Sequence, residues 1–300
     1  MARLSGYTGK ISLNGTAAVV TVSNWTINPT ANNPTGVASN SAGMEFDVEG
    51  PSDFTGTFDW YNTSPLGFIV PGTAYVFYGQ NSAYEVMGGI ICTSVTINCD
   101  IKTGAMLSGS AAFASIGSST AVHTANNTAL TYQAVTSVTN TAVPTIFPGA
   151  VCKAAWTPIL AGVAGSNADL IDVTGWSLTL ACDAPATVTS NTGGVTKRIR
   201  GPFRGCSATI NHEHSSFDFF SASATRLIPG TVGIVRLYAT ASAYFALSYM
   251  RVNGLNLAVP IESGEYVGGD IALGYTGYTN VAGVITQGSI VDPNAVTMWP

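Results

Sequence analysis

One stretch of the sequence occurs twice, and this repetition limits the fold more than any other feature. Residues 43–62 read GMEFDVEGPSDFTGTFDWYN, and residues 194–213, which lie 151 positions later, read GVTKRIRGPFRGCSATINHE. The Gly-Pro dipeptide at 50–51 falls on the one at 201–202. Each stretch has the pattern of a strand, a Gly-Pro turn and a second strand. The sequence therefore predicts two copies of one β-rich unit.

Three further anchors recur in the same order. Trp25 falls on Trp176 at the same offset of 151, Pro-Gly-Thr at 71–73 recurs at 229–231 with an offset of 158, and IKTGAMLSGSAAF at 101–113 matches IESGEYVGGDIAL at 261–273 with an offset of 160. The offset grows in one direction only, as small insertions between strands would produce. We therefore expect a first β-domain at 1–117, a linker or arm at 118–148, a second β-domain at 149–282 and a C-terminal tail at 283–300.

The fold class predicted from these patterns is all-β, with two tandem homologous β-barrel or β-sandwich domains. Apolar and polar residues alternate along most segments, and almost nothing has the period of a long amphipathic helix. Each copy has room for at most one short helix, for which SPLGFIV at 64–70 is a candidate in the first copy. Residues 28–43 consist of turn formers without periodicity, and we expect a long loop there. Loops of this length commonly contact a partner or have another function.

The composition excludes several classes of protein. Only 9% of residues are charged, against the ~25% usual in globular domains, which is typical of structural assembly proteins and of secreted β-proteins. The net charge of −5 argues against a protein that reads nucleic-acid sequence. We expect no signal peptide and no membrane span, because no apolar run reaches the ~20 residues that a spanning helix needs. Five cysteines without metal-type spacing predict free thiols in a reducing compartment.

Motifs for catalysis or metal binding are missing from the sequence, and we predict no enzyme, no cofactor and no metal. It contains no Gly-x-Ser-x-Gly, no Walker loop and no His-Glu-x-x-His. The one metal-like cluster is His212-Glu213-His214, where the two histidines would share a strand face. A third ligand is not evident, so we interpret them as two exposed histidines. A carboxylate pair such as Glu262 and Glu265 carries no catalytic signal by its spacing alone.

The charges around the repeated Gly-Pro turn have opposite sign in the two copies. Asp47, Glu49 and Asp53 correspond to Arg198, Arg200 and Arg204. Residues two apart on a strand lie on one face. One interpretation is two solvated strand faces; the other is an acidic edge of one domain that meets a basic edge of the next. The predicted interface residues are Glu45, Asp47, Glu49, Asp53, Lys197, Arg198, Arg200 and Arg204.

The strand that carries Trp25, the GTFDWY-type strand within 55–61, the Pro-Gly-Thr strand within 73–78 and the hairpin at 93–113 resemble the major tail tube proteins of long-tailed, siphovirus-type bacteriophages. The resemblance implies β-domains whose sheets join around a ring, and rings that stack into a tube for DNA passage. Single-domain members of that family form hexameric rings. A duplicated member would form a pseudo-hexameric ring from three subunits.

The resemblance also implies partners and a location. The subunit would bind copies of itself and the other tail proteins (terminator, tape measure and tail tip), and phage DNA would pass without specific binding. It would assemble in the host cytoplasm and reside in the virion, without a membrane. Loops at 28–43 and 181–195 would contact stacked rings, and the predicted stacking residues are Asn32, Asn33, Pro34, Thr35 and Gly36. Some charged positions would then face the channel.

Two alternatives stay open at this point. A capsid decoration protein or a tail-tip component would also be a structural virion protein, with a different copy number per particle. A carbohydrate-binding or adhesin module would belong to another class, and it would need an exposed aromatic platform. Trp156 or Trp299 could supply that platform.

Overall fold

A computed structural model of the 300-residue chain gives the fold. The structure describes residues 9–13, 17–18, 22–37, 42, 44–47, 50–61, 71–81, 84–117, 130–134, 148–160, 163–165, 167–170, 172–188, 196–201, 203–214, 227–240, 244–263 and 267–276. Almost all of this is antiparallel β-structure, with one short 3-10 helix, η5 (Gly149–Val151). The all-β prediction is confirmed.

The strands of the first half form what we call the first unit. They are β1 (Gly9–Leu13), β2 (Ala17–Ala18), β3 (Val22–Ala31), β6 (Ser52–Tyr61), β7 (Ala74–Asn81), β8 (Tyr84–Asp100) and β9 (Ser108–Ser115). Through the sheet, the order of pairing is β1-β7-β8-β9-β6-β3, and β2 pairs with β1.

The strands of the second half form the second unit. They are β11 (Lys153–Leu160), β12 (Val163–Ala164), β13 (Ala168–Leu170), β14 (Val173–Cys182), β17 (Phe203–His214), β18 (Val232–Tyr238), β19 (Tyr244–Ala258) and β20 (Val267–Tyr275). The order is β11-β18-β19-β20-β17-β14, and β12 pairs with β11. Within this order of six strands, each strand thus has the same neighbours as its counterpart in the first unit.

The two units share their register at two places, although a bulge at Arg204 shifts most pairs along β17 by one residue relative to β6: Trp25 pairs with Phe58, and Trp176 with Ile210. Ile97 pairs with Gly109 in the first unit and Leu257 with Gly269 in the second, and both residues of the second pair lie 160 positions after those of the first. Near the other end of the unit, Ala31 pairs with Ser52 and Cys182 with Phe203, at an offset of 151. These agreements support a duplication and define equivalent positions. The domain boundaries themselves stay a prediction.

Each unit folds its sheet into two layers around an aromatic core. The first half of β8 pairs with β7, whereas its second half pairs with β9, so one bent strand serves both layers. Phe77 from one layer lies 5.0 Å from Phe113 in the other, measured between ring centroids. Trp176 and Phe245 pack across the second unit at 6.0 Å. Large buried rings fill such an interior because each removes much apolar surface from water.

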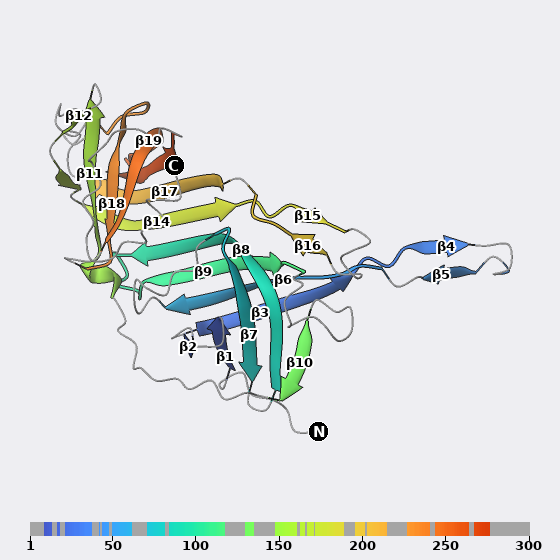
Figure 1. The fold of residues 1–300 in the computed structure, drawn as a ribbon. Coiled ribbons are helices and arrows are strands. Elements are labelled where there is room, and N and C mark those ends of the chain that lie inside the picture. The colour runs from blue at the N-terminus through green and yellow to red at the C-terminus, as the bar shows by residue number, and fades with distance from the viewer. Residues whose placement is uncertain are drawn as a thin grey trace.

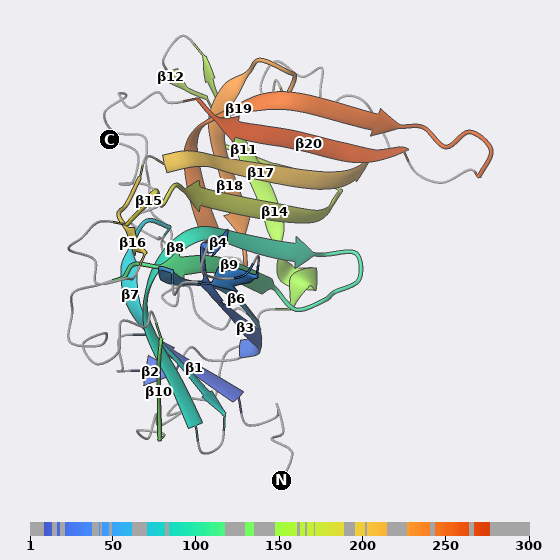
Figure 2. The same cartoon turned by 90° about the vertical axis from the view of Figure 1, so that its right-hand side faces the viewer.

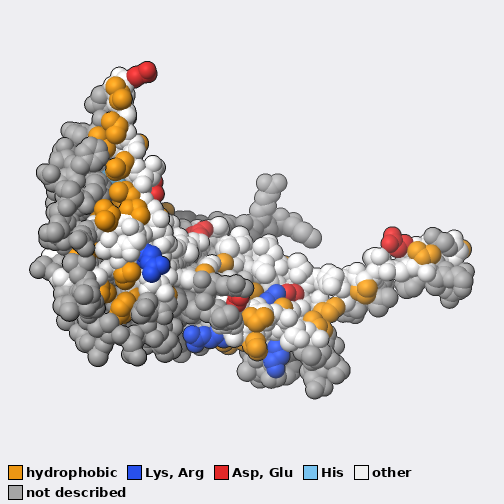
Figure 3. Space-filling model, turned by 90° about the horizontal axis from the view of Figure 1, so that it is seen from above, with side chains coloured by type: hydrophobic (Ala, Val, Ile, Leu, Met, Phe, Trp, Pro, Cys, Tyr) orange, Lys and Arg blue, Asp and Glu red, His pale blue; other side chains and the backbone are white. Residues whose placement is uncertain are grey.

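A narrow hairpin arm extends each unit. The first arm consists of β4 (Thr35–Val37) and β5 (Glu45–Asp47), and the second of β15 (Ala186–Thr187) and β16 (Lys197–Arg198). Thr35 pairs with Asp47 and Ala186 with Arg198, so the arms have equivalent registers. The first arm stands clear of the body of the molecule, as Figures 1 and 3 show.

The predicted loop at 28–43 is wrong in part. β3 continues from Trp25 through Pro29 to Ala31, and β4 begins at Thr35. This region lacks sequence periodicity because β3 pairs on one edge only, and most of its side chains from Asn28 onward are exposed. A strand without a buried face carries no alternation to detect.

Part of the predicted linker at 118–148 belongs to the first unit. β10 (Thr131–Ala134) pairs with the start of β8, and Leu130 beside it is buried. The predicted loop at 181–195 is wrong in part, because β14 extends to Cys182 and β15 spans Ala186–Thr187. The candidate helix at 64–70, the remaining loop residues 189–195 and the tail from 283 onward lie outside the described residues. The part of the chain that the structure describes has no helix long and apolar enough to cross a membrane.

Candidate assembly interface

The two units are joined edge to edge into one sheet (Figure 2), which contains 16 of the described strands. Strand β8 of the first unit pairs with β14 of the second, from Gly175 opposite Asp100 to Ala181 opposite Ser94. Ile101 N–H continues this ladder with a bond to Thr174 O at 2.8 Å. We call this pairing the in-chain joint.

Side chains on both faces of the in-chain joint are in contact. The hydroxyl oxygens of Thr96 and Thr179 lie 3.3 Å apart. On the other face, Ile97 and Leu178 are in register and both fully buried. The joint therefore combines a backbone ladder with apolar burial, which are the two contributions that stabilise neighbouring strands.

An ion pair lies at one end of the joint. Lys102 Nζ lies 2.5 Å from Glu213 Oε1, and the two side chains are 65% and 33% exposed. An exposed pair of this kind contributes about 0–1 kcal/mol. It belongs to the rim of the joint and not to its stable centre.

A second ion pair between the units is better shielded from water. Arg198, in the second arm, donates from Nη1 to Asp53 Oδ1 at 2.5 Å and from Nη2 to Asp53 Oδ2 at 2.6 Å. Arg198 Nη1 also donates to Ser115 O at 3.0 Å. The Arg198 and Asp53 side chains are only 13% and 21% exposed. This bidentate geometry fixes the position of the second arm on the first unit.

Backbone contacts support the same docking. Thr196 N–H donates to Ser52 O at 2.9 Å, and Arg198 N–H to Ile116 O at 3.2 Å. The side chain of Arg200 lies over the turn at Gly72, where a β-carbon would be 3.0 Å from Arg200 Nε. Gly72 has a φ of +83°, so glycine suits both the backbone and the limited space.

The equivalents of the joined strands are open at both outer edges of the molecule. β3 is the equivalent of β14, and among the described strands it pairs with β6 alone. The end of β19 is the equivalent of the end of β8, and its residues 254–258 pair with β20 alone within the described part of the chain. One molecule therefore presents both halves of a second joint, at opposite edges of its sheet.

Side chains at the open edges are more exposed than their equivalents in the in-chain joint. Leu257 is 37% exposed, whereas its equivalent Ile97 is 1% exposed. Val259 is 55% exposed, and its equivalent Cys99 is 5% exposed. The residues of β3 are mainly exposed, whereas those of β14 are half buried and half partly buried, with none exposed. The apolar side chains at the end of β19 are therefore those that a strand laid along that edge would cover.

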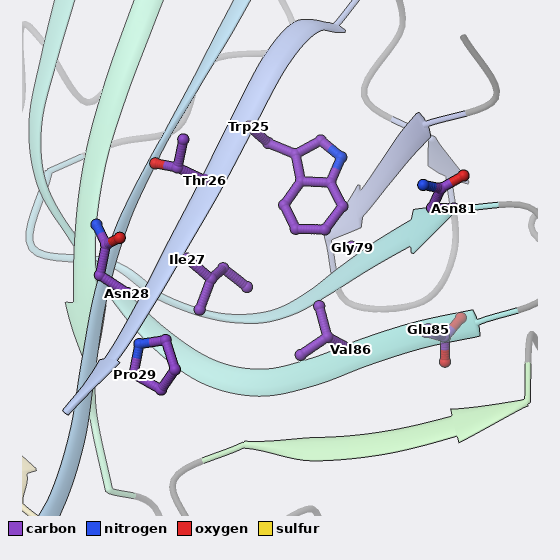
Figure 4. Close-up of a pocket in the computed structure, with 9 residues that line it drawn as sticks. All are labelled: Trp25, Thr26, Ile27, Asn28, Pro29, Gly79, Asn81, Glu85 and Val86. Carbon is purple, nitrogen blue, oxygen red and sulfur yellow. The ribbon is translucent and has the colours of Figure 1, made fainter. Parts of the chain in front are cut away.

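A groove of about 510 Å³ lies beside the open edge of β3 (Figure 4). Its lining is mostly apolar and comes from β3 and from the ends of β7 and β8: Trp25, Thr26, Ile27, Asn28, Pro29, Gly79, Asn81, Glu85 and Val86. Trp25 is half-buried and packs edge-on against Phe77 at 6.1 Å. Its equivalent Trp176 is fully buried. The groove thus lies beside a strand that pairs on one edge only among the described strands, whereas its equivalent β14 pairs on both edges.

The structure brings only some of the predicted interface residues together. Asp53 and Arg198 form the ion pair between units, whereas Glu45 and Lys197 are exposed on the two arms. Asp47 and Arg204 lie in β5 and β17. Glu49 lies outside the described residues.

Two of the predicted stacking residues form hydrogen bonds with the Gly50-Pro51 turn of the same chain. Asn32 N–H donates to Pro51 O at 3.1 Å, and Asn33 Oδ1 accepts from Gly50 N–H at 3.1 Å. Pro34 follows, and Thr35 and Gly36 begin β4. These residues form the base of the first arm, and their contact with a stacked ring stays a prediction.

Sequence reasoning missed the two open edges. The signal was present in the alternation Leu255, Leu257, Val259 and Ile261, which has the period of a strand with one apolar face. Such a pattern predicts a core face, and only the exposure of Leu257, Val259 and Ile261 shows that this face lacks a cover.

Two expectations about side chains are wrong. His212 is buried, not exposed, because it lies in β17 between β14 and β20. Trp156 is fully buried within the second unit, so it cannot form an aromatic platform. Trp299 lies outside the described residues. No group of three metal-ligating side chains occurs among the residues that the structure describes.

All five cysteines are free and buried. Burial raises the pKa of the Cys206 thiol to about 12, and it also raises the pKa of the Cys182 thiol. Both thiols therefore stay protonated and poorly reactive at neutral pH.

No family model and no curated protein sequence matches the chain.

Proposed function

We propose that this protein is a structural virion protein, the major tail tube subunit of a long-tailed bacteriophage. Three subunits form a pseudo-hexameric ring, and the rings stack into a hollow tube for genome delivery. The in-chain joint together with its two open equivalents is the observation that supports this proposal best. The resemblance of the strand motifs to tail tube proteins supports the phage assignment.

The open edges support assembly from head to tail. The end of β19 in one subunit would pair with β3 of the next, as β8 pairs with β14 within the chain. Transferring the register of the in-chain joint places Leu257 opposite Ile27 and Asn256 opposite Asn28, because their equivalents are Ile97 with Leu178 and Thr96 with Thr179. Two different edges in one contact make a heterologous interface, which closes into a ring when the rotation allows.

Charge is consistent with a channel through which DNA slides. Residues 1–117 contain three basic and seven acidic residues, which gives −4, and residues 149–282 contain eight of each, which gives zero. A neutral or acidic wall does not retain phosphates, whereas a basic wall would bind them. Passage of DNA without specific binding is therefore part of the proposal.

Negative-stain electron microscopy of the purified full chain tests the proposal. We expect rings or tubes, with threefold symmetry in class averages. Persistent monomers at all concentrations and ionic strengths would refute it.

Copy number separates the tube subunit from the alternatives within the virion. A tube subunit is among the most abundant tail proteins. A tail-tip component is present in a few copies, and a decoration protein is found with capsids and not with tails. Quantitative mass spectrometry of separated tails and capsids measures this. Deleting residues 30–40 should shorten or destabilise the tubes if the base of the first arm contacts the next ring.

A further inference from the structure

Four of the five cysteines lie at the two ends of the in-chain joint, with one from each unit at each end. Cys92 and Cys99 belong to β8 of the first unit, and Cys182 is the last residue of β14 in the second. Cys152 follows η5 directly and leads into β11 of the second unit. The open edges carry other residue types at the positions equivalent to the three strand cysteines, namely Val252, Val259 and Ala31.

A tight turn brings Cys152 beside Cys99. Cys99 Sγ lies 3.8 Å from Gly149 O, and Cys152 N–H donates to the same oxygen at 2.9 Å. Gly149 N–H in turn donates to Ala105 O at 2.8 Å. A β-carbon at Gly149 would lie only 2.2 Å from Asp100 O, so glycine is needed for the turn to approach the end of β8 this closely. The turn thus holds the first cysteine of the second unit against the first unit.

The thiols of Cys99 and Cys152 are in direct contact. They form a hydrogen bond with each other, which lowers the pKa of the Cys152 thiol and raises the pKa of the Cys99 thiol. A thiolate, and not a thiol, is the form that attacks a disulfide. At the other end of the joint, burial raises the pKa of the Cys92 thiol, and Cys182 adds a smaller electrostatic effect. Only the first of these two pairs therefore combines contact with a stabilised thiolate.

We propose that Cys99 and Cys152 are a site of reversible disulfide formation, which covalently links the two units at the in-chain joint. With a small dialkyl disulfide, the Cys152 thiolate attacks one sulfur of the reagent and releases one alkyl thiol. Cys99 then attacks Cys152 Sγ in this mixed disulfide and releases the second alkyl thiol, so the reagent gains the two electrons and two protons that the protein thiols lose. Both thiols are buried, so the turn at 149–151, where Ala150 and Val151 are exposed, opens before the first step.

The link would close the loop from residue 99 to residue 152 and fix the turn against β8. This inference goes beyond the proposed function and does not depend on it, because both cysteines belong to one chain. In the setting of the proposed function, the thiols stay reduced during assembly in the cytoplasm, and the link forms after the particle leaves it. The open edges are not changed by it.

Oxidation of the full chain with hydroxyethyl disulfide tests the inference. The reduced protein is incubated with this reagent, then denatured and labelled with N-ethylmaleimide. We expect two of the five cysteines to escape labelling, and an intact mass that shows the loss of two hydrogen atoms and no bound reagent. Oxidation should also raise the Tm by about 5 °C, because a link across a loop of this length restricts the unfolded chain.

Single alanine variants identify the two cysteines. Cys99→Ala and Cys152→Ala should each lose the internal link and the rise in Tm that oxidation causes. Cys92→Ala and Cys206→Ala are matched controls, since each removes a buried thiol from a strand and should keep both. Thermal unfolding of the reduced variants confirms that each is folded.

Three results would overturn the inference: labelling of all five cysteines after oxidation, reagent bound in place of an internal link, or a link that persists in Cys99→Ala. If an alanine variant does not fold, peptide mapping of the oxidised wild type, with a protease that cleaves between Cys92 and Cys99, identifies the linked residues directly. A wild type that never assembles would refute the proposed function and leave this inference standing.

Discussion

Strands β14 and β3 occupy the same position in the two units, and they differ in what lies beside them. β14 runs between β17 and β8, buries half of its residues and exposes none, whereas β3 pairs with β6 alone among the described strands and exposes most of its residues. The difference comes from connectivity, because the first unit of the same chain supplies β8 as a neighbour of β14. The chain thus forms one joint internally, and among its described strands the two halves of an equivalent joint stay open.

A proline marks the open strand. Ile101 N–H donates across the in-chain joint to Thr174, and alternation along β14 directs the backbone groups of Trp176, Leu178 and Leu180 toward β8 as well. The equivalent of Leu180 is Pro29, which has no N–H to offer at that edge. Proline at such a position protects an edge strand from random pairing without a loss to the β6 ladder.

The largest expected effect is the loss of assembly when the open edge of β19 can no longer form hydrogen bonds. By the same alternation, the N–H of Leu257 faces the open side, because its equivalent Ile97 faces β14. Leu257→Pro should therefore abolish assembly at concentrations where the wild type is fully assembled, while the β19–β20 ladder is kept. Size-exclusion chromatography with light scattering measures the mass.

Leu257→Thr is the matched control, since it shortens the side chain but keeps the N–H. We expect it to weaken assembly without abolishing it. Wild-type assembly by Leu257→Pro would show that subunits do not join through this edge.

The second-largest expected effect is the coupling energy of the ion pair between Arg198 and Asp53, which docks the second arm. In the monomeric Leu257→Pro background, a double-mutant cycle of Arg198→Ala and Asp53→Ala should give a coupling energy of about 1–3 kcal/mol, because the pair is bidentate and mostly shielded from water. Denaturant unfolding of the four variants measures it. A coupling near zero would mean that the second arm is held by its backbone bonds alone.

A smaller effect should appear at Trp25. In assembled protein this side chain should become as shielded as Trp176, because a neighbouring β19 would cover the groove beside it. Acrylamide should therefore quench the Trp25 fluorescence less in assemblies than in the Leu257→Pro monomer, with Trp25→Phe used to subtract the other tryptophans. Equal quenching in the two states would place the contact elsewhere.

The smallest expected effect concerns Pro29. Pro29→Leu and Pro29→Ala both restore an N–H at the open edge of β3, and each should lower the assembly midpoint about threefold to tenfold, the effect of one hydrogen bond worth about 1 kcal/mol. The two variants differ in side chain, so agreement between them assigns the effect to the backbone. Sedimentation velocity provides the midpoint, and an unchanged value would show that the ladder does not reach this residue.

The sequence predicted much of the fold because most strands bury one face. The repeat at 43–62 and 194–213 gave equivalent arms, and the offsets of 151 and 160 agree with the registers of the arms and of β20. Along β17 the offset is 152, because a bulge at Arg204 inserts one residue. The base of the first arm was not predicted, since β3 and β4 have no buried face there to impose a period. His212 was misjudged for the opposite reason, because a polar residue inside the sheet cannot be recognised from its type.

The candidate interface could be predicted only in outline. The reversed charges at Asp53 and Arg198 are visible in the sequence, and they identify the region of contact between units. Their pairing within the chain is not visible there. It depends on the position of the second arm over the first unit, which follows from the long-range pairing of β8 with β14.

The sequence by itself thus determined a duplicated all-β chain with opposite charges at equivalent positions. Alternation and turn residues are local properties, and they specify strands and their order of repetition. Only the tertiary structure decided which edges are paired and which remain open, because edge pairing joins residues that are far apart in the chain. The same apolar residue type is core at Ile97 and exposed at Leu257, and the difference is the presence of a neighbouring strand.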